Sequence, residues 1–183
     1  MDSGAVLDAG MLYFSARLSR AHPTIEVRVA DVPLDVNVTA TVAALVRAMV
    51  DTAADEWRRG VPAPEMPTSL LRLASWRAAL EGARGALLDP VSGQQAPGVA
   101  VLGRLLAHVM DALEQNGDDR IVLDGLGTIV TEGTGADLQR RSLRSIEHLD
   151  EVVAAAVERT AAGPSVPART AEPVIRSHGT ARR

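Results

Sequence analysis

A glutamate and an arginine, two residues apart, are the pair in this sequence best placed to do chemistry together. Glu26 and Arg28 lie within residues 22–31, HPTIEVRVAD, where apolar β-branched residues alternate with polar ones. A period of two predicts a strand with one apolar and one polar face. The two charged side chains therefore share a face, roughly 6.5 to 7 Å apart along the strand. From the pattern alone, they fit either a solvated ion pair or two groups that together bind a ligand.

Composition narrows the classes of protein to consider. The chain has 183 residues, 46% of them hydrophobic, enough for one core with an appended tail. A net charge of -4 and only four aromatic residues argue against nucleic acid as a partner. Cysteine is absent, which excludes disulfides and thiolate metal sites. With no apolar run of roughly 18 residues and no basic region of a signal peptide, we expect a cytoplasmic protein that does not contact membrane.

The periodicity predicts an α+β fold in which a short antiparallel β-hairpin near the N-terminus is followed by about five helices. Residues 11–17 and the stretch within 22–31 predict the two strands. Beyond them, apolar residues recur at spacings of three and four, which is typical of amphipathic helices. The expected helical segments are 37–59, 68–80, 97–116, 118–130, a short one after Gly135, and 145–160. The first helix is expected to be capped by Asn37 or Thr39, and the second by Thr68 or Ser69. Pro97 is expected in the first turn of the third helix.

The predicted elements include no further strands with which the hairpin could form a larger sheet. An isolated two-stranded hairpin is marginal in water. Either the helices cover it, or the rest of the sheet belongs to another chain or to an upstream segment. We expect residues 1–162 to form the domain, and residues 163–183, which lack periodicity, to form a disordered tail.

Four stretches of the sequence carry a resemblance to a known family. They are DAGMLYFSARLSRAHPTIEVRVADVPLDV, LVRAMVDTAADEW, SWRAALEGARGALLDPVSG and GTGADLQRR. In this order, they resemble the carboxylate-amine ligases of the glutamate-cysteine ligase type 2 family. The resemblance covers roughly residues 3 to 160, and the spaced motifs together make it specific.

The resemblance implies a glutamine synthetase-like catalytic domain, built around an antiparallel sheet that holds nucleotide and metal. Ligases of this kind phosphorylate a carboxylate, typically that of glutamate, with ATP, and an amine such as that of cysteine displaces the phosphate. The chemistry needs carboxylates to hold Mg²⁺ and arginines to neutralise the phosphoryl group in flight. On this basis, Glu26 is expected to be a magnesium ligand and Arg28 the catalytic residue at the phosphoryl group.

For several other residues, both a functional and a structural role fit the sequence. Arg17, at the end of the first strand, could bind a substrate carboxylate or phosphate, or could be solvated. Asp31 could orient Arg17 or Arg28, or could merely end the strand. Tyr13 and Arg77 are candidates for substrate or phosphate binding, but packing is the favoured role of Tyr13 and a structural ion pair that of Arg77. Arg140, in the last motif, is similarly open.

One departure from the family pattern bears on activity. The first half of family members carries a G-x-E-E-E cluster that supplies most magnesium ligands, and nothing here matches it. We therefore expect the C-terminal half of a ligase, inactive alone, that needs an N-terminal ligase half or a second copy as its partner. The alternative is a non-catalytic helical interaction module derived from such a ligase.

Overall fold

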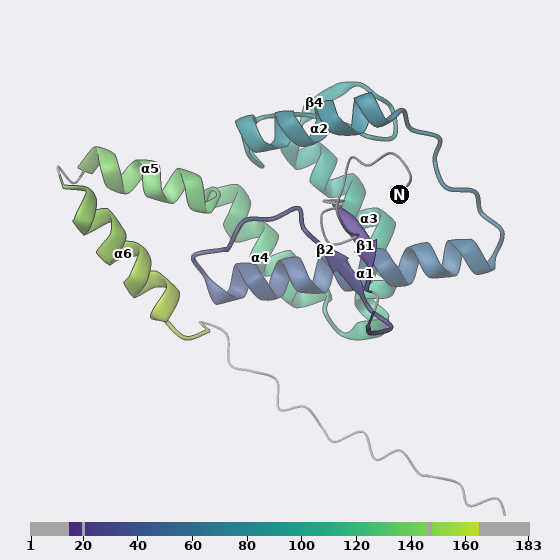
Figure 1. Ribbon diagram of the computed structural model, residues 1–183, viewed down its shortest axis with the longest axis horizontal. Coiled ribbons are helices and arrows are strands. Elements are labelled where there is room, and N and C mark those ends of the chain that lie inside the picture. The colour runs from purple at the N-terminus through teal and green to yellow at the C-terminus, as the bar shows by residue number, and fades with distance from the viewer. Residues whose placement is uncertain (1–14, 20, 146–147, 165–183) are drawn as a thin grey trace, which may run out of the picture.

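The computed structural model describes residues 15–19, 21–145 and 148–164. Within them the chain forms two separate two-stranded antiparallel sheets and six helices, which confirms the expected mostly helical α+β fold class. The strands are β1 (Ala16–Leu18), β2 (Ile25–Val27), β3 (Ala86–Leu88) and β4 (Gln95–Pro97). The helices are α1 (Val36–Arg58), α2 (Thr68–Glu81), α3 (Gly98–Asn116), α4 (Asp119–Glu132), α5 (Gly135–Ser145) and α6 (Leu149–Ala161) (Figure 1). The predicted tail, apart from residues 163 and 164, lies outside the described residues.

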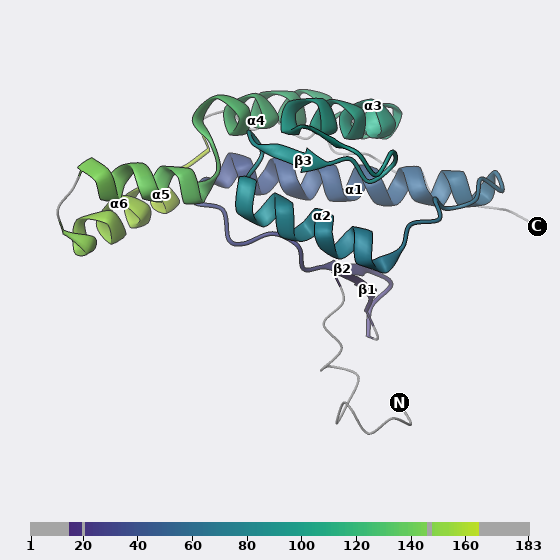
Figure 2. The same ribbon diagram turned by 90° about the horizontal axis from the view of Figure 1, so that it is seen from above.

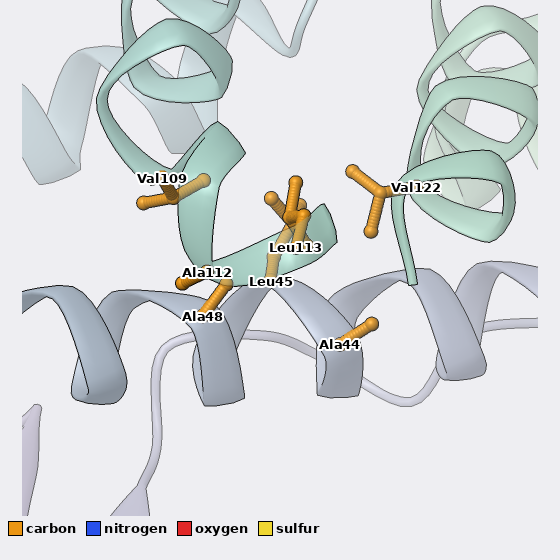
Figure 3. Packing of buried hydrophobic residues seen from close by; sticks show 7 residues of the cluster. All are labelled: Ala44, Leu45, Ala48, Val109, Ala112, Leu113 and Val122. Carbon is orange, nitrogen blue, oxygen red and sulfur yellow. The ribbon is translucent and has the colours of Figure 1, made fainter. Parts of the chain in front are cut away.

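The long helix α1 organises the molecule. Figure 2 shows α3 and α4 on one side of α1 and the β1–β2 hairpin on the other, while α2 packs against β3. The buried core lies where α1 meets α3 and α4 (Figure 3). It is made of small and medium side chains: Ala44, Leu45, Ala48, Val109, Ala112, Leu113 and Val122. Because most of them are alanine or valine, the helix backbones can approach closely.

The corner between α3 and α4 is tied to α1 by polar side chains. Arg47 of α1 donates to the buried carboxylate of Asp118, with Nε 3.0 Å from Oδ2. Asn116 donates its amide to Asp51, 2.8 Å away. Gly117 ends α3 in the left-handed conformation, with φ of 70°, as the Asn116-Gly117 signal predicts.

Several predicted boundaries need correction. Asp35 caps α1, since its carboxylate accepts from the backbone N–H of Asn37, 2.8 Å away, so neither Asn37 nor Thr39 is the cap. Pro67 precedes α2, where no side chain provides a cap. Pro97 ends β4 and lies just before α3, not in its first turn.

The β3–β4 hairpin has no counterpart in the sequence prediction. Its strands are three residues long and lack the alternation that marks a half-buried strand. Asp89 forms the turn by accepting from the backbone N–H of Val91 at 3.0 Å and the hydroxyl of Ser92 at 2.9 Å. Arg104 of α3 pairs with the same carboxylate at 2.9 Å, which fixes the hairpin to the helix.

Other faces of the helices are poorly covered. Trp57 of α1 is 80% exposed, and no residue of α2 is buried. The helix α1 also has the length and hydropathy of a membrane span, although no uninterrupted apolar run indicated one. One such helix is weak evidence for a span; 22% of its apolar window is buried, and α1 contributes residues to the core.

Helices α1 and α4 are in tight contact at Gly125. The hydroxyl of Thr41 is buried there and donates to the carbonyls of Asn37 at 2.8 Å and Ile121 at 3.3 Å. A Cβ added at Gly125 would collide with the Thr41 side chain. Glycine at this position therefore sets the distance between the two helices.

We expect Gly125→Ala to lower the free energy of unfolding by about 1 to 3 kcal/mol, because overpacking forces the two helices apart. Gly127→Ala, two residues along the same helix, is the matched control, since nothing lies within 4 Å of its added Cβ. Alanine there should raise stability by about 0.5 to 1 kcal/mol through helix propensity. Urea unfolding monitored by circular dichroism compares the two variants; equal stabilities would contradict the tight crossing.

Candidate active site

The β1–β2 hairpin brings together the three charged residues singled out near the N-terminus. Its register places Arg17 opposite Glu26 and Leu18 opposite Ile25. Directly opposed residues lie on the same face of an antiparallel pair, and neighbours along a strand lie on opposite faces. One face therefore carries Arg17 and Glu26, with Arg28 two residues further along, and the other face carries Leu18 and Ile25.

Glu26 bridges the two arginines. Its Oε2 accepts from Nε of Arg17 at 2.6 Å, and its Oε1 accepts from Nε of Arg28 at 2.6 Å. The three side chains keep between 26% and 38% of their surface exposed, so they lie neither in the core nor in bulk water. Hydrogen bonds from Arg17 and then Arg28 hold the pKa of the Glu26 carboxyl below its ordinary value. The cluster combines two cations and one anion, so its net charge is positive.

The described residues do not by themselves form a magnesium site. Within residues 15–19, 21–145 and 148–164, no group of three or more acidic or histidine residues gathers as metal ligands would. Mg²⁺ requires an octahedral set of oxygens. Glu26 has the right chemistry for one of them, but it is a single carboxylate and both its oxygens accept from arginine.

The structure places the remaining predicted site residues apart from this cluster or outside its described part. Asp31 accepts from the backbone N–H of Val32 at 2.8 Å. Arg77 donates to the carbonyl of Ala86 at 3.3 Å and lies 3.7 Å from Glu81, so it joins α2 to β3. Tyr13 lies outside the described residues. The functional assignments of all three stay predictions.

The last family-like stretch, GTGADLQRR, builds the start of α5. The hydroxyl of Thr134 donates to the carboxylate of Asp137 at 3.0 Å, and the backbone N–H of Thr134 donates to it at 2.9 Å. This is close to a capping box, whose S/T-x-x-E signature is readable in sequence. These hydrogen bonds keep the pKa of Asp137 below its ordinary value. Arg84 at 3.6 Å and Arg140 at 3.8 Å pair with Asp137, so Arg140 takes part in a structural ion pair.

A cavity of about 540 Å³ lies between α5, α6 and Leu34, and no hairpin residue lines it. Arg159 on its wall pairs with Glu132 at 3.0 Å and lies 3.9 Å from Asp35. These ion pairs hold α6 to the end of α4 and to the start of α1. The cavity therefore lies at the junction of these helices and is separate from the charged cluster.

A comparison with protein families matches residues 1–160 to glutamate-cysteine ligase family 2. The chain belongs to this family. The match confirms the resemblance inferred from the motifs, and it includes the Arg17–Glu26–Arg28 cluster and the Asp89 turn.

Curated relatives agree with this membership. "Putative glutamate--cysteine ligase 2" of Streptomyces coelicolor is 48% identical over 160 residues, which are 87% of this chain and 44% of the relative. "Putative glutamate--cysteine ligase 2-1" of Paenarthrobacter aurescens is 43% identical over 162 residues, 87% of this chain and 42% of the relative. The chain thus spans less than half the length of the curated relatives it matches.

The effect of the two arginines on Glu26 can be measured one at a time. We expect Arg17→Gln to raise the pKa of Glu26 toward its ordinary value of 4.5, and Arg28→Gln to raise it less, because the hydrogen bond from Arg17 lowers this pKa more. A lowered folded-state pKa stabilises the hairpin above the unfolded-state value, and this stabilisation is lost as pH falls through the folded-state pKa.

NMR titration of the Glu26 side-chain carboxyl carbon gives the pKa in each variant. Arg58→Gln is the control, since Arg58 pairs with Asp55 within α1. A Glu26 pKa that stayed equally low in both hairpin variants would contradict the bridging geometry.

Proposed function

We propose that this chain forms part of an ATP-dependent carboxylate-amine ligase of the glutamate-cysteine ligase type. The observation that carries the proposal is the convergence of Arg17, Glu26 and Arg28 on one hairpin face in a chain that belongs to this family. Strands hold side chains more rigidly than loops, which suits a site that acts by positioning. In this proposal, Arg28 is the catalytic residue.

The proposed reaction transfers the terminal phosphoryl group of ATP to a carboxylate, typically the γ-carboxylate of glutamate. A carboxylate oxygen bonds to the phosphorus while the bond to ADP breaks. The amine, such as that of cysteine, then attacks the acyl phosphate, an amide forms, and inorganic phosphate leaves with the amine proton going to solvent. Arg28 stabilises negative charge on the phosphoryl oxygens, and Arg17 offers a forked partner to the phosphate or the substrate carboxylate.

Magnesium is the expected metal for ATP, and we propose Glu26 as one of its ligands. Because the described residues hold no group of three or more metal-ligating side chains, we propose that the remaining ligands come from the part of a ligase that lies outside the matched region. We propose that activity requires this segment, either in the same protein or as a separate partner.

A non-catalytic helical interaction module is the second candidate. The absence of a metal-ligand cluster among the described residues favours it, as does the exposure of large apolar side chains such as Trp57 and Trp76. The two candidates differ in one measurable respect, since only the ligase consumes ATP.

The test uses the full chain, mixed with the segment of the Streptomyces coelicolor relative that lies outside the match. We expect ADP release that depends on glutamate, an amine and Mg²⁺. Glu26→Gln and Arg28→Ala should each lower the rate about 100-fold or more, because the first removes a charged magnesium ligand and the second a cation that stabilises the phosphoryl oxygens. Arg58→Gln, an exposed arginine elsewhere, should leave the rate unchanged.

Two results would contradict the assignment. If the mixture releases ADP at the same rate with Glu26→Gln or Arg28→Ala, the hairpin is not the site. If it binds but never consumes ATP under any of these conditions, the interaction module becomes the better account.

A further inference from the structure

The cavity at the junction of α5 and α6 has an apolar part and a charged part. Both helices lie at one end of the molecule, away from the β1–β2 hairpin (Figures 1 and 2). The volume of about 540 Å³ falls among those of pockets that bind small molecules. Its apolar lining residues are buried or half-buried: Leu34, Leu138, Val152, Ala155 and Ala156. The charged residues Arg141 and Glu158 are exposed, so they lie nearer to the opening of the cavity.

These two opposite charges are available to a ligand. Within the part of the chain that the structure describes, the side chains of Arg141 and Glu158 take part in no hydrogen bond or ion pair, including with each other. Unpaired charges are common on protein surfaces. Here, however, the cation comes from α5 and the anion from α6, and both line one cavity. A bound molecule can therefore meet both signs of charge at once.

The wall beside Arg141 holds further donors. The guanidinium of Arg159 pairs with Glu132, but its Nε is buried and no described residue accepts from it. The hydroxyl of Ser142 and the side-chain amide of Gln139 also line the cavity. A carboxylate has about four lone-pair sites, so it can accept from a guanidinium and from a neighbouring hydroxyl or amide together.

We propose that this cavity binds a free α-amino acid with an apolar side chain. Arg141 pairs with the carboxylate, Glu158 pairs with the ammonium group, and the apolar lining covers the side chain. A carboxylate without an amine would leave Glu158 unpaired beside it, and an amine alone would leave Arg141 unpaired. An acidic side chain would bring a second charge against apolar walls, so the site disfavours glutamate. The proposal is independent of the ligase function, since no residue of the charged cluster lines the cavity.

A ligand in this position contacts three parts of the chain. The lining comes from α5, from α6 and from Leu34, which precedes the α1 cap Asp35. A molecule that binds only the assembled junction stabilises it by mass action. We therefore expect an apolar amino acid to raise the thermal unfolding temperature of the full chain in proportion to its occupancy.

The experiment titrates the full chain with L-leucine and with compounds that each lack one part of it, by ligand-observed NMR. The compound 4-methylpentanoate lacks the ammonium group, 3-methylbutylamine lacks the carboxylate, and glycine lacks the side chain. We expect each of them to bind about 10-fold or more weakly than L-leucine, because one part of the wall then stays without its partner.

Two substitutions assign the charges. Arg141→Gln should weaken L-leucine about 10-fold or more while leaving 3-methylbutylamine within about twofold, because only the carboxylate loses its partner. Glu158→Gln should weaken L-leucine to a similar extent and leave 4-methylpentanoate no weaker. Both residues are exposed, so circular dichroism should show an unchanged fold. Arg144→Gln and Glu151→Gln are the matched controls, since they lie on the same two helices and do not line the cavity.

Three results would overturn the amino-acid site. The first is no binding of L-leucine at millimolar concentration, and the second is equal affinity for 4-methylpentanoate, which would make the cavity a carboxylate site. The third is L-leucine binding that neither Arg141→Gln nor Glu158→Gln weakens, which would place the ligand elsewhere. The titrations contain no ATP, so failure of the proposed ligase reaction leaves this site standing, and loss of the site leaves the ligase proposal untouched.

Discussion

The close packing of α1 against α3 and α4 is the constraint on which the rest of the structure depends. Alanines in α1 and Gly125 in α4 let the helices approach until the hydroxyl of Thr41 reaches the carbonyl of Ile121. Because the contacting residues are small, this core is narrow and lies on one side of α1. The β1–β2 hairpin lies on the other side of α1, whereas α2 packs against β3.

That arrangement explains why the charged cluster is ordered locally. Glu26 is held by its cross-strand neighbour Arg17 and by Arg28 on its own strand, so the cluster needs only the hairpin to form. Partly exposed ion pairs contribute little to global stability. Their effect is to keep Glu26 ionised and to hold two guanidinium groups in place, which is a positioning effect.

Most of the fold is predictable from the sequence because helices leave a strong periodic signal. The end of α3 at Gly117 and the pairing of the first two strands are confirmed, as they rest on apolar spacing and turn residues. The β3–β4 hairpin is missed because three-residue strands have no measurable period, and its stability comes from Asp89 and Arg104, which are distant in sequence. Caps are misplaced by one to four residues, where several polar residues compete locally.

The candidate site, like the fold, is only partly predictable from the sequence. Period two places Glu26 and Arg28 on one face, but only the strand register shows that Arg17 joins them. Asp31 and Arg77 bind groups near them in sequence, the Val32 amide and the Ala86 carbonyl, and a pattern of residue types does not reveal such contacts. The exposure of Leu18 could not be predicted at all, since alternation identifies two faces without saying which one is covered.

The same alternation links the two faces of the hairpin physically. A register slip of one residue in either strand would exchange the apolar and charged sets, so whatever fixes Leu18 opposite Ile25 also fixes Arg17 opposite Glu26. A sheet face that becomes buried specifies its register strongly, whereas an exposed one specifies it weakly. Burial of the apolar face by a partner would thus determine the geometry of the charged face, and a chain that keeps both faces uncovered holds its cluster only through the ion pairs of Glu26.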